Sequence, residues 1–315
     1  MTAPTPRDKD APLIEVRNLV TRFDLRGGVL GRISGRVHAV ENVSFDIFPG
    51  ETLALVGESG CGKSTVARSL IQLEKPLSGS IRYDGMEMIG APRRDLARFR
   101  RDVQMIFQDP FSSLNPRMTI EQALMDPMRV HRMGTTKTRR ESAAQLLAKV
   151  ELPAEHLERY PHAFSGGQRQ RICIARALAM DPRLIIADEA VASLDVTIQA
   201  QVINLLMDLQ REMRIALLFI SHDMAVVERI AHRVAVMYLG EIVEIGDRRS
   251  VFGNPQHPYT RKLLSTVPVA DPTQRPEGRE PMADEIPSAV RDVDFVPVER
   301  PMREVSSTHF VREAA

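Results

Sequence analysis

The fold of this chain is decided by one stretch, Gly57-Glu58-Ser59-Gly60-Cys61-Gly62-Lys63-Ser64-Thr65. An apolar run at residues 52–56 precedes it, and an apolar run with helical periodicity at residues 66–73 follows it. Together the three segments predict a strand, a glycine-rich loop and a helix. Such a loop lets backbone N–H groups close around phosphate oxygens at the positive end of a helix.

Two side chains of this loop indicate which ligand it binds. Lys63 is placed to reach the β- and γ-phosphates of a nucleotide, and Ser64 is placed to hold Mg²⁺. A glycine turn that only caps a helix is the alternative. By average residue usage, however, this spacing arises by chance in about one chain in a hundred of this length. The sequence therefore predicts a nucleoside triphosphate site with Mg²⁺.

Cys61 lies inside this loop and allows two interpretations. An N–H-rich loop at a helix N-terminus favours the thiolate, which predicts a reactive thiol that bound nucleotide protects. Cysteine is also among the residue types that are most often buried, so the second interpretation is a small buried filler.

The composition restricts the class of protein. The chain has 315 residues, enough for one large or two ordinary domains, and its net charge of +1 gives no general reason to expect a nucleic-acid partner. Its two cysteines are too few for a disulfide framework. Residues 1–10 resemble neither a signal peptide nor a transit peptide, and the longest apolar runs are too short to cross a bilayer. We expect a soluble protein of a reducing compartment.

The N-terminal region predicts an antiparallel sheet. Residues 14–23 and 37–48 alternate apolar and polar side chains around a Gly/Arg-rich interruption at residues 26–36, which predicts two strands joined by a long loop. Phe23, just before that loop, has two interpretations. It stacks on the adenine ring of the nucleotide, or it is a core residue at the end of a strand.

Two buried-type strands end in polar side chains. The run at residues 103–107 ends at Gln108, and the run at residues 184–187 ends at Asp188 and Glu189. In open α/β sheets the carboxyl ends of the strands carry the ligand contacts. Asp188 is suited to orient Mg²⁺ and Glu189 to accept a proton from an attacking water. A buried strand that ends in two acids is common, so alone this pattern is weak evidence for a catalytic site. In a chain that also has the phosphate-binding loop it is strong evidence.

A helical insertion and a second glycine motif lie between these strands. The spacing of apolar residues is helical from residue 119 to residue 158. Phe164-Ser165-Gly166-Gly167-Gln168 then opens a helix that runs to about Met180, with Ser165 as its N-cap. This start is either a simple capped helix or a second anion site.

Further along, Ser193-Leu194-Asp195 precedes a helix that reaches Met213, and a buried run at residues 215–220 ends at Ser221-His222. His222 contacts a γ-phosphate or only caps the next segment. From Asp271 onward prolines recur among balanced charges, which predicts a tail that is mobile or draped on a neighbour.

These motifs, in this order, resemble the ATP-binding cassette ATPase across roughly residues 11–250. Residues 106–117 and 254–260 are similar to the oligopeptide/dipeptide importer branch of that family. The resemblance implies an α/β P-loop NTPase core with an antiparallel β subdomain and an inserted helical subdomain near residues 110–178. It also implies a flexible N-terminus at residues 1–10, an ATPase domain at residues 11–253 and a C-terminal extension at residues 254–315.

The resemblance also implies a role for each matching residue. Glu189 is the general base, His222 contacts the γ-phosphate, and Gln108 senses Mg²⁺, the attacking water and the permease. Asp195 is a link across a dimer of cassettes. The residues that bind the chain's own ATP are Gly57, Glu58, Ser59, Gly60, Cys61, Gly62, Lys63, Ser64 and Thr65, and the stacking interpretation given above adds Phe23. Those that hold Mg²⁺ are Ser64, Gln108 and Asp188. Those that close on the ATP of the other subunit are Ser165, Gly166, Gly167 and Gln168.

The chain departs from the family pattern at two positions. Ala190 stands where many cassettes have proline after the catalytic glutamate, and Phe164 stands where leucine usually begins the signature motif. Neither change touches a group that contacts phosphate. The C-terminal extension also holds no cysteine cluster of the kind some peptide-importer ATPases carry, which excludes an iron–sulfur centre there.

The expected partners follow from the importer branch. They are two integral-membrane permease subunits, a second ATPase subunit that is a copy or a paralogue, and, indirectly, a solute-binding protein. The implied location is the cytoplasmic face of the inner membrane, with no nucleic acid as partner. The alternatives are a cassette ATPase that acts on nucleic acid or the ribosome, and a small-molecule kinase on a P-loop scaffold. The transported solute stays open.

Overall fold

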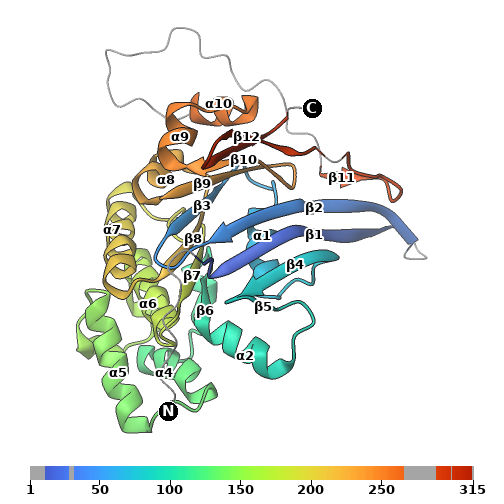
Figure 1. Cartoon of the computed structure of the whole chain (residues 1–315). Helices are drawn as coiled ribbons and strands as arrows, with labels where there is room; N and C mark the ends of the chain where they lie inside the picture. The colour runs from blue at the N-terminus through green and yellow to red at the C-terminus, as the bar shows by residue number, and fades with distance from the viewer. Residues whose placement is uncertain (1–10, 28–31, 266–288, 299, 314–315) are drawn as a thin grey trace, which may run out of the picture. The chain divides into compact units, whose positions relative to one another are not determined.

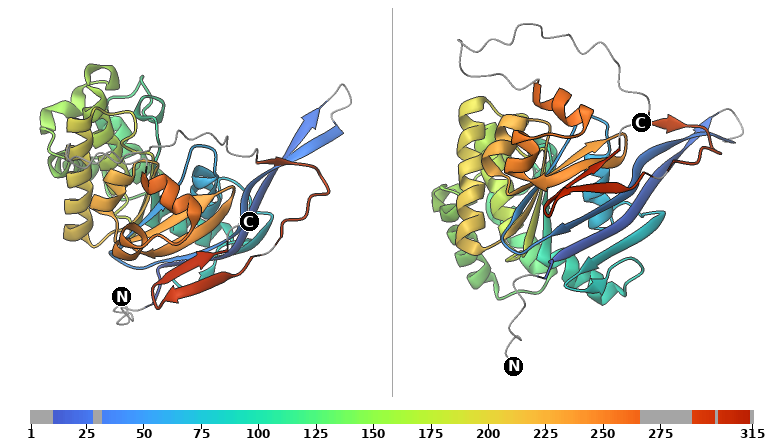
Figure 2. Two further views of the ribbon diagram at one scale, coloured as in Figure 1. Left: turned by 90° about the horizontal axis from the view of Figure 1, so that it is seen from above. Right: turned by 45° about the horizontal axis from the view of Figure 1, so that its top comes forward.

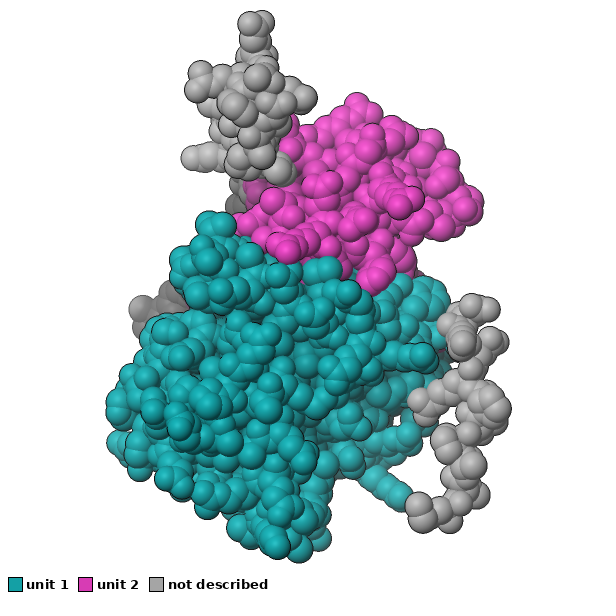
Figure 3. Space-filling model, turned by 90° about the vertical axis from the view of Figure 1, so that its left-hand side faces the viewer, with its two compact units in different colours: residues 1–14, 46–53, 82–220 teal, residues 15–45, 54–81, 221–315 magenta. Residues whose placement is uncertain are grey.

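The computed structural model describes residues 11–27, 32–265, 289–298 and 300–313 (Figure 1). The chain divides into two compact units, which Figure 3 colours separately. Unit 1 comprises Met1–Ile14, Asp46–Leu53 and Arg82–Ile220, and unit 2 comprises Glu15–Phe45, Ala54–Ile81 and Ser221–Ala315.

Unit 1 contains three parallel strands in the order β6 (Val103–Ile106), β7 (Leu184–Asp188) and β8 (Ala216–Ser221). Every residue of β7 and β8 is buried, as expected for continuous apolar runs inside a parallel sheet. Ile106 pairs with Ala187, so β6 and β7 end side by side. The predicted strands and their parallel α/β arrangement are confirmed.

The remaining elements of unit 1 are mostly helical. They are β5 (Met86–Glu87), α2 (Arg93–Asp102), α3 (Pro110–Ser113), α4 (Ile120–Val130), α5 (Thr136–Lys149), η1 (Ala154–Glu158), η2 (Pro161–Ala163), α6 (Gly166–Leu178) and α7 (Val196–Met213). Helices α4 and α5, drawn green, lie side by side in Figure 2. Three of these helices begin with capping boxes, formed by Thr119 with Gln122, Thr135 with Thr138, and Ser165 with Gln168.

Unit 2 contains parts of two sheets. One has the order β11-β2-β1-β4 and the other the order β12-β13-β10-β9-β3. The strands that lie wholly or mostly in unit 2 are β1 (Ile14–Gly27), β2 (Arg32–Ile47), β3 (Thr52–Val56), β4 (Ser78–Tyr83), β9 (Arg233–Tyr238), β10 (Glu241–Asp247), β11 (Val290–Arg291), β12 (Met302–Ser306) and β13 (His309–Arg312). The helices are α1 (Lys63–Leu70), α8 (Met224–Ile230), α9 (Arg248–Gly253) and α10 (Pro258–Ser265).

Two expectations from the sequence are wrong in unit 2. The long loop expected at residues 26–36 is largely strand, because β1 extends to Gly27 and β2 begins at Arg32. The second is the tail expected to be mobile or draped on a neighbour from residue 271 onward: residues 271–288 lie outside the described residues, but in the described part that follows, β13 is antiparallel to β10 and β11 is antiparallel to β2. Edge strands gain their backbone partners from distant segments, so their local sequence carries a weak signal.

The length and apolarity of a helix decide whether it can cross a membrane. None of the helices in the described ranges combines the length and the apolarity that a bilayer span requires.

Candidate nucleotide-binding site

The phosphate-binding loop lies in unit 2, between β3 and α1, and two of its positions require glycine. Gly57 has φ 153° and Gly62 has φ 108°. A Cβ atom would lie 2.2 Å from Met237 O at the first position and 2.0 Å from Ala39 O at the second. A Cβ atom added at Gly60, which has φ 81°, would have no heavy atom within 4 Å. The loop is therefore tightly packed at Gly57 and Gly62 and open at Gly60.

Lys63 folds back onto this loop. Its side chain is only 4 % exposed, and its Nζ donates hydrogen bonds of 2.7 Å to Gly57 O and to Glu58 O. Helix α1 begins at Lys63, and its N-cap Gly62 has no side chain that caps it. An α-helix leaves the first N–H groups without an intrahelical partner, so this turn presents amide donors beside a buried cation. The arrangement fits a polyphosphate.

Cys61 is a buried filler in this loop. Its side chain is 4 % exposed, and this burial raises the pKa of the thiol, while the neighbouring ammonium of Lys63 lowers it by less. Burial therefore favours the filler interpretation over the thiolate, because desolvation of the thiolate outweighs the effect of Lys63. The backbone of Cys61 is also engaged, since Gly240 N–H donates to Cys61 O at 3.0 Å.

Phe23 and His222 are the other predicted site residues of unit 2. Phe23 lies within β1 rather than at its end, and its side chain is 36 % exposed, which argues against the core interpretation. His222 is exposed and directly follows β8.

In unit 1 the structure joins Gln108 to Glu189. Gln108 Nε2 donates a hydrogen bond of 2.7 Å to Glu189 Oε2, because β6 and β7 end next to each other. Glu189 itself has φ 47°, and its N–H donates to Ile220 O at 3.0 Å. Asp188, the last residue of β7, is 3 % exposed. The sequence placed both side chains at strand ends but gave no sign that they bond to each other.

The second glycine motif begins α6. Ser165 Oγ accepts from Gln168 N–H at 3.3 Å, and Gln168 Oε1 accepts from Ser165 N–H at 3.1 Å, so the predicted N-cap is confirmed. A Cβ atom at Gly167 would lie 2.3 Å from Ile198 Cγ2, which makes glycine necessary there for packing. Gly166 is less constrained.

Asp195 has a structural role that the sequence analysis missed. Its carboxylate caps α7 by accepting from Ile198 N–H at 3.0 Å. The signal was present, since an aspartate directly before a helical run is a common N-cap. Ile198 thus contacts both helix starts, through its amide at α7 and its side chain at Gly167.

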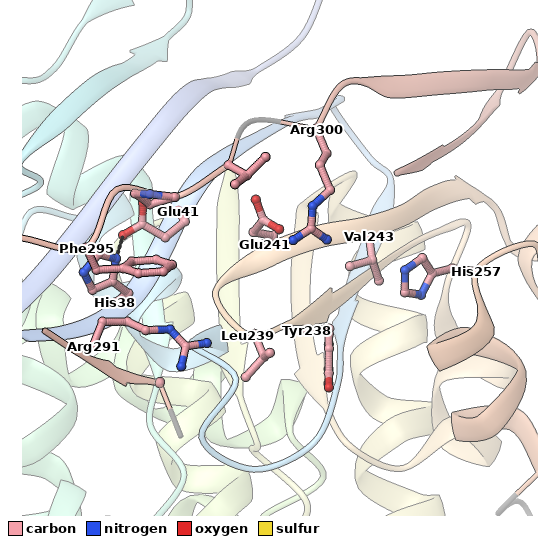
Figure 4. Close-up of a pocket in the computed structure, with 13 residues that line it drawn as sticks. His38, Glu41, Tyr238, Leu239, Glu241, Val243, His257, Arg291, Phe295 and Arg300 are labelled. Carbon is pink, nitrogen blue, oxygen red and sulfur yellow. Dashed lines mark ion pairs between the residues drawn. The ribbon is translucent and has the colours of Figure 1, made fainter. Parts of the chain in front are cut away.

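A cavity in unit 2 is separate from the phosphate-binding loop. It has a volume of about 150 Å³, and the residues labelled in Figure 4 that line it include His38, Tyr238, His257, Arg291 and Arg300. Its lining residues all lie outside residues 57–65, so the phosphate-binding loop forms no part of its wall.

A glycine loop that bends where only glycine fits, and a buried lysine at the start of the following helix, define this chain as a P-loop nucleotide-binding protein. Comparison with known proteins narrows the class to one family. The family model described as ABC transporter matches residues 40–192, and the model described as oligopeptide/dipeptide transporter, C-terminal region, matches residues 243–291. The chain belongs to the ABC transporter ATPases and carries this type of C-terminal region.

Curated relatives include proteins named glutathione import ATP-binding protein GsiA. The one from Pectobacterium atrosepticum is 57% identical over 300 residues, which cover 95% of this chain and 48% of that protein. The one from Escherichia coli K12 is 60% identical over 279 residues, which cover 89% of this chain and 45% of that protein. The chain thus spans about half the length of the curated relatives it matches.

Solved structures agree with this assignment. The ATP-binding cassette MJ0796, a dimer bound to ADP and Pi, has a TM-score of 0.66 and 28% identity, and the match covers 75% of this chain and 99% of that one. CbiO1 from Clostridium perfringens, part of the transporter complex cbiONQ, has a TM-score of 0.66 and 27% identity, with 77% and 91% covered. The fold predicted from the sequence is confirmed.

Proposed function

We propose that this chain is the ATP-binding and ATP-hydrolysing subunit of an importer for peptides or a related small solute. The observation that carries the proposal is the pairing of Gln108 with Glu189 at the ends of β6 and β7, in a chain whose phosphate-binding loop fits a polyphosphate. The comparisons give no support to a cassette ATPase that acts on nucleic acid.

The proposed chemistry divides among few side chains. Lys63 and the amides at the start of α1 bind the β- and γ-phosphates. Glu189 accepts the proton of the attacking water, and Gln108 holds the carboxylate of Glu189 in position through their hydrogen bond. His222 contacts the γ-phosphate.

The residues proposed to hold Mg²⁺ are Ser64, Gln108 and Asp188. They would offer a hydroxyl, an amide oxygen and a carboxylate, which are the oxygen ligands that Mg²⁺ prefers. When bound, the ion neutralises charge that develops on the phosphate oxygens.

Each ATP would be shared between two cassettes. Ser165, Gly166, Gly167 and Gln168 would close on the ATP of the other subunit, and Asp195 would link the two subunits. The dimeric MJ0796 cassette supports a dimer of this kind. The second ATPase subunit is a copy or a paralogue.

The proposed partners are two membrane permease subunits, with a solute-binding protein acting through them at the opposite face. This places the chain at the cytoplasmic face of the inner membrane as a peripheral subunit. Phe111, which is 59 % exposed just after Gln108-Asp109-Pro110, gives this segment an apolar contact for a permease. The names of the curated relatives make glutathione a candidate cargo.

Uptake measurements test the proposal. Cells that carry or lack the gene are supplied with labelled glutathione and with a labelled dipeptide, and the deletion is complemented by the wild type or by Lys63→Ala. We expect uptake of one label to depend on the gene and to fail with Lys63→Ala. Equal uptake in all four strains for both labels, together with purification of the chain without any permease, would remove the transport role.

A further inference from the structure

The C-terminal extension contacts the phosphate-binding loop through one tyrosine. Glu58 N–H donates a hydrogen bond of 2.9 Å to Tyr259 Oη, across 201 positions of the sequence. Both residues lie in unit 2. Tyr259 is 7 % exposed, and burial raises its pKa, so the hydroxyl stays neutral in this contact.

This contact holds one peptide group of the loop from both sides. That group joins Gly57 to Glu58: its N–H, on Glu58, donates to Tyr259, and its C=O, on Gly57, accepts from Lys63 Nζ at 2.7 Å. A second backbone bond, from Gly240 N–H to Cys61 O, fixes the loop three residues further on. The beginning of the loop is therefore restrained before any phosphate arrives.

A buried carboxylate holds Tyr259 in its place. Glu244 on β10 is 0 % exposed and accepts from Gln256 N–H at 2.8 Å and from His257 N–H at 2.9 Å. His309 Nε2 of β13 lies 2.7 Å from Glu244 Oε1. His257 Nδ1 in turn accepts from Tyr259 N–H at 3.2 Å, which sets the first turn of α10.

The ring of Tyr259 is supported from the side as well. It packs on Tyr238, with ring centroids 4.3 Å apart and planes inclined by 35°. Tyr238 and His257 also form part of the wall of the cavity in Figure 4. The hydroxyl is thus aimed at Glu58 by groups on three elements, α10, β9 and β10.

We propose that Tyr259 is a positioning residue of the nucleotide site, and that the C-terminal extension braces the phosphate-binding loop through it. The inference rests on the proposed ATP-binding function. It assigns a purpose to the part of the chain that matches the oligopeptide/dipeptide C-terminal model, because residues 243–291 include both Glu244 and Tyr259. A loop already restrained loses less conformational entropy when ATP binds.

Tyr259→Phe removes only the hydroxyl and tests the brace. Without nucleotide, we expect amide exchange of the loop peptide that contains Glu58 to become about three- to tenfold faster, the range that one net hydrogen bond is worth. The Kd for a fluorescent ATP analogue should rise by a similar factor, while kcat at saturating ATP stays near the wild-type value.

Tyr238→Phe is the matched control. It removes the hydroxyl of the neighbouring ring, for which the described residues show no hydrogen-bond partner, so exchange and Kd should stay unchanged. If Tyr259→Phe leaves both exchange and Kd at the values of the control, the brace does not exist. If Tyr259→Phe lowers the melting temperature and kcat but leaves the exchange rate and the Kd unchanged, the role of the tyrosine is only structural. A wild type that does not bind ATP would instead overturn the proposed function. The exchange measurement would still show whether Tyr259 restrains the phosphate-binding loop.

Discussion

Glu189 lies where the backbone leaves β7 in a left-handed turn. Its φ of 47° is uncommon for a residue other than glycine and costs on the order of 1–3 kcal/mol. That turn and the hydrogen bond from Gln108 aim the carboxylate in one direction. Such fixed placement is what a general base needs, because its carboxylate must lie within hydrogen-bond reach of the water.

Replacing Glu189 with glutamine tests the base directly. The amide keeps the shape of the side chain but accepts a proton poorly, so ATP hydrolysis should fall by a factor of about 10² or more. ATP binding should survive, because the loop at residues 57–65 is unchanged. Phosphate release and equilibrium ATP titration measure the two quantities. Near-normal turnover would exclude Glu189 from the mechanism.

The thiol of Cys61 should be inert in the folded protein. Its burial and raised pKa leave little thiolate at pH 7.5, and the thiolate is the form that reacts. The test uses the Cys173→Ala variant, since Cys173 is also buried and its pKa is raised to about 11. A maleimide should label this variant slowly when native and rapidly in denaturant. Fast native labelling that ATP prevents would restore the thiolate interpretation.

At the scale of elements, α7 depends on its cap. Asp195→Ala removes the carboxylate that accepts from Ile198 N–H, so the free energy of unfolding should fall by about 1 kcal/mol. Asp208→Ala is the control on the same helix. Its carboxylate is 69% exposed and pairs with Arg211 three residues on, so we expect a change within about 0.5 kcal/mol. Urea unfolding measures the free energy of unfolding of both variants. Equal decreases would show that the Asp195 cap stabilises α7 no more than the exposed Asp208 does.

The sequence predicted elements whose signals are local. Strand β7 and helix α6 follow from an apolar run and from a serine cap with helical periodicity, and both were placed within about two residues. Strands β12 and β13 were missed because their short segments lie among prolines and charges, and their partners are far away in sequence.

The same reason explains what was missed in the site. Each strand end was found from its own run of residues, whereas the bond from Gln108 to Glu189 joins positions 81 apart. The contact of Tyr259 with Glu58 spans 201 positions. No periodicity or cap reports such a pairing, because it depends on how the sheet orders its strands.

At the scale of the whole molecule, the proposed dimer predicts how one substitution acts. Ser165→Arg fills the start of α6 with a large side chain. If α6 serves the ATP of another subunit, dilute monomer should still bind ATP while hydrolysis disappears. Specific activity of the wild type should also rise with protein concentration. A Ser165→Arg monomer that no longer binds ATP would show that the site is built within one subunit.

The pairing of Glu244 with His309 also affects how the chain folds during its synthesis. The two residues are 65 positions apart, and ribosomes add about 5–20 residues per second. Roughly 3 to 13 seconds therefore pass between synthesis of the carboxylate and synthesis of the imidazole beside it. During that interval β10 has emerged without β13, and its outer edge is open to any other strand. Synthesis of β13 closes that edge, so a premature stop shortly before His309 would leave the edge of β10 without this partner.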